Sequence, residues 1–319
     1  MTLDTGIRDK LVLPAIVAPM FMVSCPRLAI ASCAAGLIGS LTRNHCRTNE
    51  EFEQEIITVN EGLARVRDTA NGVRIGPLAA NISVNTPQDV VDAALDACIR
   101  HGVDIVLTAS GNPTEVTKVV QGAGRKIFHD VTSVRFAEKA IKAGVDGVIA
   151  IGAGGGGHSG TMSHLALVPQ IRSMFDGTIV MAGAITTGAA IRAAEVLGAD
   201  LAYLGTRFIA TQESMAPLAY KQMLVSETAA DLIYTPFANA VPAMWMKKSI
   251  RELGMDPENL PTPGAVRDIS HLPQGVKPWV NLWSGGQGID LIHDIPPVAD
   301  LVDRLRQEYL TAAAVPAMV

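Results

Sequence analysis

The sequence predicts a (β/α)8 barrel of the TIM type, and the prediction depends on three observations. Eight short apolar runs recur over about 225 residues, and their length suits strands that are buried on both faces of a parallel sheet. Helix-like segments lie between these runs. No G-x-G-x-x-G turn follows the first run, which disfavours the alternative of a doubly wound open sheet.

The predicted strands follow one another along the chain at regular intervals. They are Leu13–Met20, Leu37–Leu41, Pro77–Ser83, Ile105–Ser110, Lys126–Val131, Gly147–Gly152, Ile179–Ala184 and Leu201–Ile209. The segment "TPQDVVDAALDACIRHG" shows the helix signals, because Thr86 suits an N-cap, Pro87 the first turn, and Gly102 the position past the end. The segments "KAGVDGV" and "VLGADLAYL" repeat one exit from helix to strand, in which an aspartate precedes the strand.

The strand–helix rhythm breaks after about Ser226, and this break predicts the organisation of the chain. We expect residues 1–225 to form the barrel. Residues 226–290 are rich in proline, and their mixed pattern predicts a helical insert or lid over the barrel mouth. Residues 291–319 predict an amphipathic C-terminal helix that packs on the barrel.

Composition excludes several classes of function. The formal net charge is −5, and the chain has no basic run, so we do not expect a nucleic-acid partner. The polar start and the absence of a long apolar run predict no membrane association. The four cysteines form no C-x-x-C pair, which suits reduced thiols in a cytoplasmic protein. No His/Cys/Asp cluster has the spacing of metal ligands, so we expect no metal.

Active sites of such barrels lie at the C-terminal ends of the strands. Among the residues just past the predicted strands, the only acid is Asp130, which disfavours hydrolysis by paired carboxylates. The glycines Gly183 and Gly205, after the last two strands, would let backbone N–H groups approach an anion. Phosphate commonly binds at these two loops of a barrel, although each glycine alone also suits a tight turn.

The sequence at these loops resembles a known family. The segment "MAGAITTGAAIRAAEVLGADLAYLGTRFIATQES" resembles the FMN-phosphate segment of the nitronate monooxygenases, formerly called 2-nitropropane dioxygenases, and "GGGGHSG" resembles their G-G-H-x-G loop. The segments "LPAIVAPM", "AANIS" and "LWSGGQGID" fall in the family's order, so the resemblance covers nearly the whole chain. The flavin enoyl-acyl-carrier-protein reductases and the NADH:quinone reductases of the same fold share this combination.

The resemblance implies one FMN per chain, with its ring across the barrel mouth. Three residues after the first strand would contact the ring, Asn81 would face it, and Gln287 would approach it from the late loop. Four residues in the last two strand-end loops would hold the phosphate. The full set of expected cofactor-binding residues is Ala18, Pro19, Met20, Asn81, Thr108, Asp130, Gly157, Ala182, Gly183, Ala184, Gly205, Thr206 and Gln287.

Two departures from the family's pattern concern the same site. Many relatives carry acidic residues before the Gly-Gly-His motif, where this chain has "GAGGGGH". Many relatives also have Lys after the histidine of the fifth strand, where this chain has Asp130. A cation there stabilises reduced anionic flavin, and an ionised aspartate does not.

His158 is the predicted catalytic residue. Six of the nine residues from Gly152 to Gly160 are glycine, and His158 is the one titratable residue among them. The C–H bond beside a nitro group is acidic, so a base that titrates near neutral pH removes its proton. The alternative is that His158 only hydrogen-bonds a substrate or the backbone. His129, at the end of the fifth strand, is expected either to touch the flavin or to be packed in the core.

The resemblance therefore implies FMN-dependent oxidation of nitronates or nitroalkanes by O2 to a carbonyl compound and nitrite. Two alternatives stay open. One is an NAD(P)H-dependent FMN reductase acting on a quinone or an enoyl thioester, and the other is a flavin-binding protein with little turnover. The expected partners are the small-molecule substrate and O2, and a homodimer is compatible with the sequence.

Overall fold

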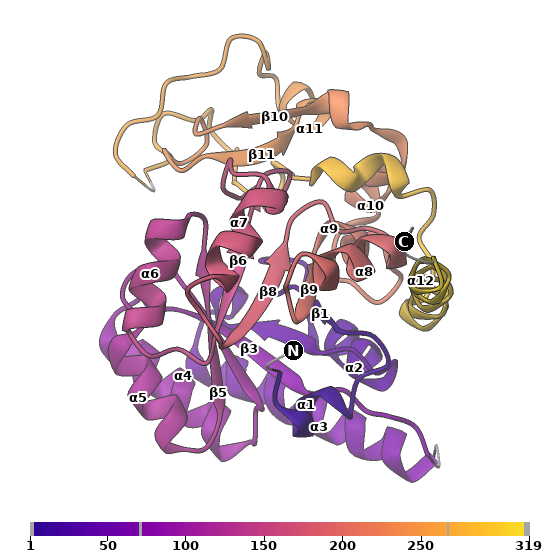
Figure 1. The fold of residues 1–319 in the computed structure, drawn as a ribbon. Coiled ribbons are helices and arrows are strands. Elements are labelled where there is room, and N and C mark those ends of the chain that lie inside the picture. Colours follow the sequence, from indigo (N-terminus) through magenta and orange to yellow (C-terminus); the bar gives the residue numbers. More distant parts are fainter. Residues whose placement is uncertain (1–2, 70–71, 267, 316–319) are drawn as a thin grey trace.

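The computed structural model describes residues 3–69, 72–266 and 268–315, and eight parallel strands form a barrel in this range (Figure 1). The strands run in the order β1-β9-β8-β6-β5-β4-β3-β2, and the parallel bridge between Ile16 and Ile38 joins β1 to β2 and closes the barrel. Each predicted strand overlaps one of them, which confirms the fold. The strands are β1 (Ala15–Val17), β2 (Gly39–Thr42), β3 (Leu78–Ser83), β4 (Ile105–Ala109), β5 (Lys126–Val131), β6 (Gly147–Ile151), β8 (Thr178–Ala182) and β9 (Leu201–Leu204).

Helices alternate with the strands and cover the outside of the barrel. They are α2 (Pro26–Ala34), α3 (Asn49–Thr69), α4 (Gln88–Arg100), α5 (Thr114–Gly122), α6 (Val134–Lys142), α7 (His164–Arg172) and α8 (Gly188–Val196). After the last strand, α9 (Thr206–Ile209) and α10 (Leu218–Ser226) lie at the barrel mouth. The C-terminal helix α12 (Val298–Ala313) packs against α8 and α2, so it fills the last place in the ring of helices. A Cβ at Gly188 would collide with the α12 backbone, which shows how closely α8 and α12 approach.

The barrel interior is filled by apolar side chains, one set from each strand's inward face. This core includes Ile16, Ile105, Phe128 and Val180, all fully buried or nearly so. Leu3, Ile7 and Leu11, in and around the short helix α1 (Thr5–Arg8), join the same cluster. The barrel is therefore a packed core, and ligand space is left only beyond the interior, where the strands end.

The repeated aspartate before a strand has a structural role at the opposite end of the barrel. Each carboxylate accepts the hydrogen bond of the first or second residue of a neighbouring strand. The pairs are Asp104 with the Leu78 N–H (3.0 Å), Asp146 with the Ile127 N–H (3.0 Å) and Asp200 with the Ile179 N–H (2.9 Å). The motif seen in the sequence thus joins adjacent strands at the end remote from the site.

Two predicted strands are much longer than the observed ones: the run Leu13–Met20 contains only β1, Ala15–Val17, and the run Leu201–Ile209 contains only β9. The run Leu201–Ile209 was expected to be continuous, but β9 ends at Leu204 and α9 begins at Thr206, after Gly205. The apolar residues Phe208 and Ile209 continue the hydrophobic run because this short helix is also buried. A buried turn of helix and a buried strand give the same apolar pattern over so few residues.

The segment after residue 226 covers the C-terminal ends of the strands, as Figure 1 shows in orange. It contains the expected helical pieces η2 (Ala229–Asp231), α11 (Lys247–Glu252) and η3 (Gln287–Leu291), but its centre is the antiparallel pair β10 (Leu232–Thr235) and β11 (Ala243–Met246). The third strand of this sheet is β7 (Gly157–His158), which comes from the glycine-rich loop of the barrel. We call residues 226–291 the lid.

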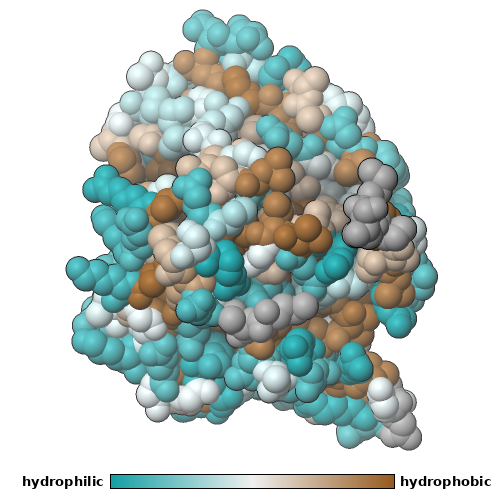
Figure 2. Space-filling view, in the orientation of Figure 1, coloured by the Kyte–Doolittle hydropathy of each residue, from teal (hydrophilic) through white to brown (hydrophobic). Residues whose placement is uncertain are grey.

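Hydrophilic residues cover most of the outer surface on the face shown in Figure 2, and hydrophobic residues lie there in separate groups. No helix in the described ranges is long and apolar enough to cross a membrane.

Candidate active site

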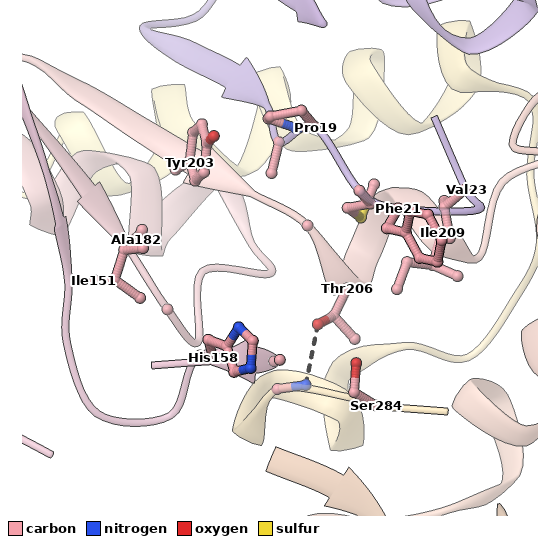
Figure 3. A pocket seen from close by; sticks show the side chains of 18 of the residues that line it. Pro19, Phe21, Val23, Ile151, His158, Ala182, Tyr203, Thr206, Ile209 and Ser284 are labelled. Carbon is pink, nitrogen blue, oxygen red and sulfur yellow. Dashed lines mark hydrogen bonds between the residues drawn. The ribbon is translucent and has the colours of Figure 1, made fainter. Parts of the chain in front are cut away.

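A cavity of about 430 Å³ lies between the barrel mouth and the lid (Figure 3). Its wall is formed by residues at the ends of the barrel strands, by Tyr220 of α10, and by the lid residues Trp279, Ser284, Gly286 and Gly288. Most of the residues predicted from the sequence line it. They are Ala18, Pro19, Met20, Asn81, Asp130, Gly157, His158, Ala182, Gly183, Ala184, Gly205 and Thr206.

Two predicted residues lie outside the cavity wall. Thr108 is buried behind it, where its hydroxyl contacts Nδ1 of His129 at 2.8 Å. Gln287 is exposed, and its backbone N–H donates to the Gly154 carbonyl at 2.9 Å. Ile105 and Leu107 enter the barrel interior, so Thr108 lies on the outward face of β4, and Ala109 lines the cavity in its place. The glycines on either side of Gln287 line the cavity as well.

The glycine-rich loop is bare because three backbone segments meet on it. A Cβ at Gly156 would lie 2.9 Å from the Gly286 nitrogen and 3.0 Å from Oγ1 of Thr206. A Cβ at Gly160 would lie 2.5 Å from the Thr132 carbonyl oxygen and 2.8 Å from the Ile151 carbonyl oxygen. Real Cβ atoms do not approach neighbours this closely, so larger residues would separate the loop from these neighbours. Close packing of the loops therefore explains several of these glycines.

His158 is held on the lid side of the cavity by a strand pairing. It lies on β7, opposite Ala243 of β11. Nε2 of His158 lies 3.2 Å from Nδ2 and 3.5 Å from Oδ1 of Asn239, whose Oδ1 also accepts the Val241 N–H at 3.2 Å. Its ring packs edge-on against Trp279, with 4.9 Å between the ring centroids. The exposed imidazole therefore has a fixed orientation although it lies on a loop.

The other two histidines near the site belong to the supporting structure. His129 is buried against Thr108, and burial lowers the pKa of its imidazole to about 4, so the ring is neutral. Of the two expectations for His129, the packed position is the observed one. His164 contacts the Ala182 carbonyl oxygen with its Nε2, at 2.7 Å, and so positions the end of β8.

The loop after β8 forms one part of the cavity wall. Among the described residues, the backbone N–H groups of residues 183–186 make no hydrogen bond, and all four residues line the cavity. Gly183 has φ +119° and Ala184 has φ 54°, so the backbone leaves the extended conformation at the end of β8. The first N–H of α8, on Gly188, donates to the Glu308 carboxylate at 2.7 Å and is therefore not available to a ligand.

The structure adds residues that sequence reasoning missed. Tyr203 lies inward on β9, beside the cavity, and Asn44 reaches it from the segment after β2. Figure 3 shows the side chains of Pro19 and Tyr203 on one side of the cavity and those of His158 and Ser284 on the other. The alternation of inward and outward residues along "LAYL" would have identified Tyr203, whereas nothing in the sequence pattern marks Asn44.

A potential metal-binding group lies outside the cavity, in His45, Cys46 and Glu55. Each offers one ligand atom, and these atoms lie within 4.8 Å of one another. Nε2 of His45 contacts Oε1 of Glu55 at 2.9 Å. Burial, reinforced by Glu55, raises the pKa of the Cys46 thiol to about 12. No spacing of metal ligands is present in the sequence, and this group is one that only the fold brings together.

The closed barrel and the cavity at its mouth define the class of protein, a (β/α)8-barrel enzyme. A family model described as nitronate monooxygenase matches residues 7–308. The chain therefore belongs to the nitronate monooxygenase family and is a flavin-dependent oxidoreductase.

Individual relatives show how far the similarity extends. The chain is 28% identical to a nitronate monooxygenase of Paraburkholderia phytofirmans, over 97% of this chain and 96% of that protein. It is similar to the solved nitroalkane oxidase of Streptomyces ansochromogenes, with 27% identity, a TM-score of 0.81, and coverage of 97% and 99% of the two chains. FabK from Thermotoga maritima matches with a TM-score of 0.76 at 24% identity, over 98% of each chain, which shows the shared fold.

Proposed function

We propose that this protein is an FMN-dependent enzyme that oxidises nitronates or nitroalkanes with O2, giving a carbonyl compound and nitrite. The observation that carries the proposal is the placement of His158. It is the one histidine among the residues that line the cavity, and the lid holds it opposite the strand ends. The names of the Paraburkholderia and Streptomyces relatives refer to the same two substrate classes.

The residues of the cavity fit FMN. The N–H groups of residues 183–186 offer donors for its phosphate, and Gly205 leaves open space because a Cβ there would meet Met20 Sδ only at 3.5 Å. Ala18, Pro19 and Asn81 offer a surface for the ring on the barrel side. When bound, FMN would supply an electron acceptor that reacts with O2.

The chain's own residues would prepare the substrate for that oxidation. A nitroalkane would lie between the barrel mouth and the lid, with its acidic C–H towards the imidazole of His158. His158 would take this proton on a ring nitrogen, and Asn239 would hold the ring in place while it does so. Trp279 and the lid would exclude water from the carbanion-like product. With a preformed nitronate, His158 would only bind and orient the anion.

The alternative is a reductase that takes hydride from NAD(P)H. A relative from Rhodococcus jostii, named as a carboxyl-CoA dehydrogenase of an octahydroindene acid, is 28% identical over 72% of this chain and 61% of that protein, so another oxidoreductase reaction occurs on related sequences. Anaerobic mixing separates the two functions. We expect a nitronate to bleach the flavin absorbance rapidly and NADH to bleach it slowly, and the opposite result would establish the reductase.

The remaining expectations from the sequence are part of the proposal. We place the enzyme in the cytoplasm, either as a monomer or as a homodimer, with a small molecule and O2 as its partners. We assign cofactor binding to the barrel, residues 1–225, and substrate enclosure to residues 226–290, with residues 291–319 as a packing helix. Size-exclusion chromatography with light scattering measures the oligomeric state.

A further inference from the structure

Asp130 is a buried acid for which the protein supplies no partner. It lies at the end of β5 and is the one acidic residue among those that line the cavity. Its Oδ1 is buried and makes no hydrogen bond within the described residues. A buried carboxyl oxygen without a partner is costly, so a bound molecule is expected to satisfy it.

The surroundings of Asp130 contain no cation that would hold it ionised. The cavity wall includes no lysine or arginine. On β5, the neighbouring His129 is neutral and contacts Thr108. The loop after β6 brings His158 to the same cavity, on its lid side. The adjacent strands β4 and β6 contribute Ala109 and Ile151 to the wall, and neither of these side chains titrates.

Tyr203 on β9 is a polar group whose pKa depends on the charge of Asp130. Burial raises the pKa of the Tyr203 hydroxyl well above its usual value, and the charge of Asp130 raises it further. The hydroxyl therefore stays protonated, and it lies in the same cavity wall as the carboxyl. The side-chain amide of Asn81, which also lines the cavity, already has partners: it accepts from the Thr42 hydroxyl and donates to the Leu107 carbonyl. Two polar groups, the carboxyl and the phenol, are thus presented together to a ligand.

The protonation of the carboxyl follows from its position. Burial raises the pKa of Asp130 from 3.8 to about 7. Near neutral pH a large fraction of the molecules therefore carries a carboxylic acid, whose O–H donates a hydrogen bond into the cavity.

We propose that Asp130 binds the ring of the cofactor as a neutral carboxylic acid that donates a hydrogen bond, with the Tyr203 hydroxyl as the second polar contact. This inference rests on the proposed function, because it assigns a partner to Asp130 within the proposed FMN site. It explains how an acid occupies a cavity wall that has no cation. It also makes the binding of flavin dependent on pH, because ionisation removes the donor and places a negative charge beside the ring.

Flavin binding should weaken as the pH rises. If only the neutral acid binds, the Kd for flavin stays constant well below pH 7 and rises by up to tenfold per pH unit above it. The experiment titrates the full-length protein, freed of bound flavin, with FMN and with riboflavin from pH 6 to 9, and follows the quenching of flavin fluorescence. Riboflavin has no phosphate. If the Kd values of both ligands change equally with pH, the pH dependence arises from binding of the ring.

Three variants complete the test. In Asp130→Asn, which keeps an N–H donor and does not ionise, we expect a riboflavin Kd that is independent of pH. Asp176→Asn removes an exposed acid away from the cavity and should keep the wild-type slope. Tyr203→Phe should weaken flavin binding at all pH values and leave the pH dependence of the Kd unchanged. Equal slopes in the wild type and Asp130→Asn would overturn the inference and leave the cofactor assignment intact.

A second readout does not depend on flavin or on the folding of a variant. Wild-type protein labelled with ¹³C at its aspartate carboxyls should show one aspartate that titrates near pH 7 in NMR spectra, and its absence would overturn the inference. A protein with this titration that binds neither FMN nor riboflavin would refute the cofactor assignment itself, and with it the role of Asp130 towards the ring.

Discussion

The substitution Gly156→Ala tests whether the glycine-rich loop is bare because it packs on backbone. Gly156 does not have a positive φ, so alanine introduces no backbone strain there. Its Cβ would lie 2.9 Å from the Gly286 nitrogen, 3.0 Å from Thr206 Oγ1 and 3.1 Å from the Gly285 carbonyl carbon. The first two atoms are joined by a hydrogen bond of 3.0 Å, so no flexible side chain end can move aside without breaking it.

The magnitude follows from these contacts. Overpacking of a rigid site costs about 1–3 kcal/mol, and the loss of one hydrogen bond costs about 1 kcal/mol more. We therefore expect Gly156→Ala to lower the free energy of unfolding by about 2–4 kcal/mol. In a chain of this size each kcal/mol lowers Tm by roughly 2 °C, so the expected fall is about 4–8 °C. The flavin content of the purified protein should also fall, because Gly156 lines the cavity.

The assay compares thermal unfolding, followed by circular dichroism, with flavin absorbance in the same samples. Gly122→Ala is the matched control, because it makes the same chemical change at the end of α5, where a Cβ meets nothing within 4 Å. That variant should gain up to about 1 kcal/mol from helix propensity. If Gly156→Ala were as stable as the wild type and kept its flavin, the packing argument for the loop would be wrong.

Four further predictions concern the site and the barrel. His158→Asn should lower kcat on neutral nitroalkanes by about a hundredfold or more and on preformed nitronates far less, whereas the exposed His293→Asn should change neither, and equal losses on both substrates would show that His158 positions the anion. Gly205→Asp, at a position with room for a side chain, should give folded protein without flavin, and a yellow product would place the phosphate elsewhere. Because burial raises the pKa of Asp130 above its unfolded value, the wild type should lose stability relative to Asp130→Asn as the pH rises from about 4 to 7, and a constant difference in urea unfolding would contradict this. Asp200→Asn should lower Tm by several degrees with little change in KM, because it breaks an ion pair with Arg172 far from the site.

The barrel was predictable from the sequence because its strands are buried on both faces. The eight apolar runs, interrupted by helix signals such as Pro87 and Gly102, mark the units without any knowledge of distant contacts. The overrun of the last predicted strand, through Gly205–Ile209, arose where a buried helical turn continues the apolar pattern. Strand β7 was not predicted, because two residues form a strand only when the distant strand β11 lies beside them.

The sequence predicted the strand-end residues of the site better than it predicted the lid residues. Ala18, Gly183 and Thr206 line the cavity because a barrel brings all strand ends to one mouth. Trp279 lies on the cavity wall, against His158, and its place in the sequence does not distinguish it from a tryptophan that only packs inside the lid. Asn239 lies 81 residues from His158, which it contacts, and no local sequence pattern predicts a contact between residues so far apart.

The pairing of β7 with β11 has a consequence for the evolution and engineering of this enzyme. The residue proposed as the base is encoded in the barrel half of the gene, but its position is set by the sequence around Ala243 and Met244. Lid sequences could be exchanged between relatives to change which substrate fits. Such an exchange would also change the orientation of the His158 side chain, because β7 pairs with β11 of the lid. Selectivity and chemistry are inherited together in this architecture, and a chimera that keeps activity must transplant the β10–β11 hairpin with the glycine-rich loop that pairs to it.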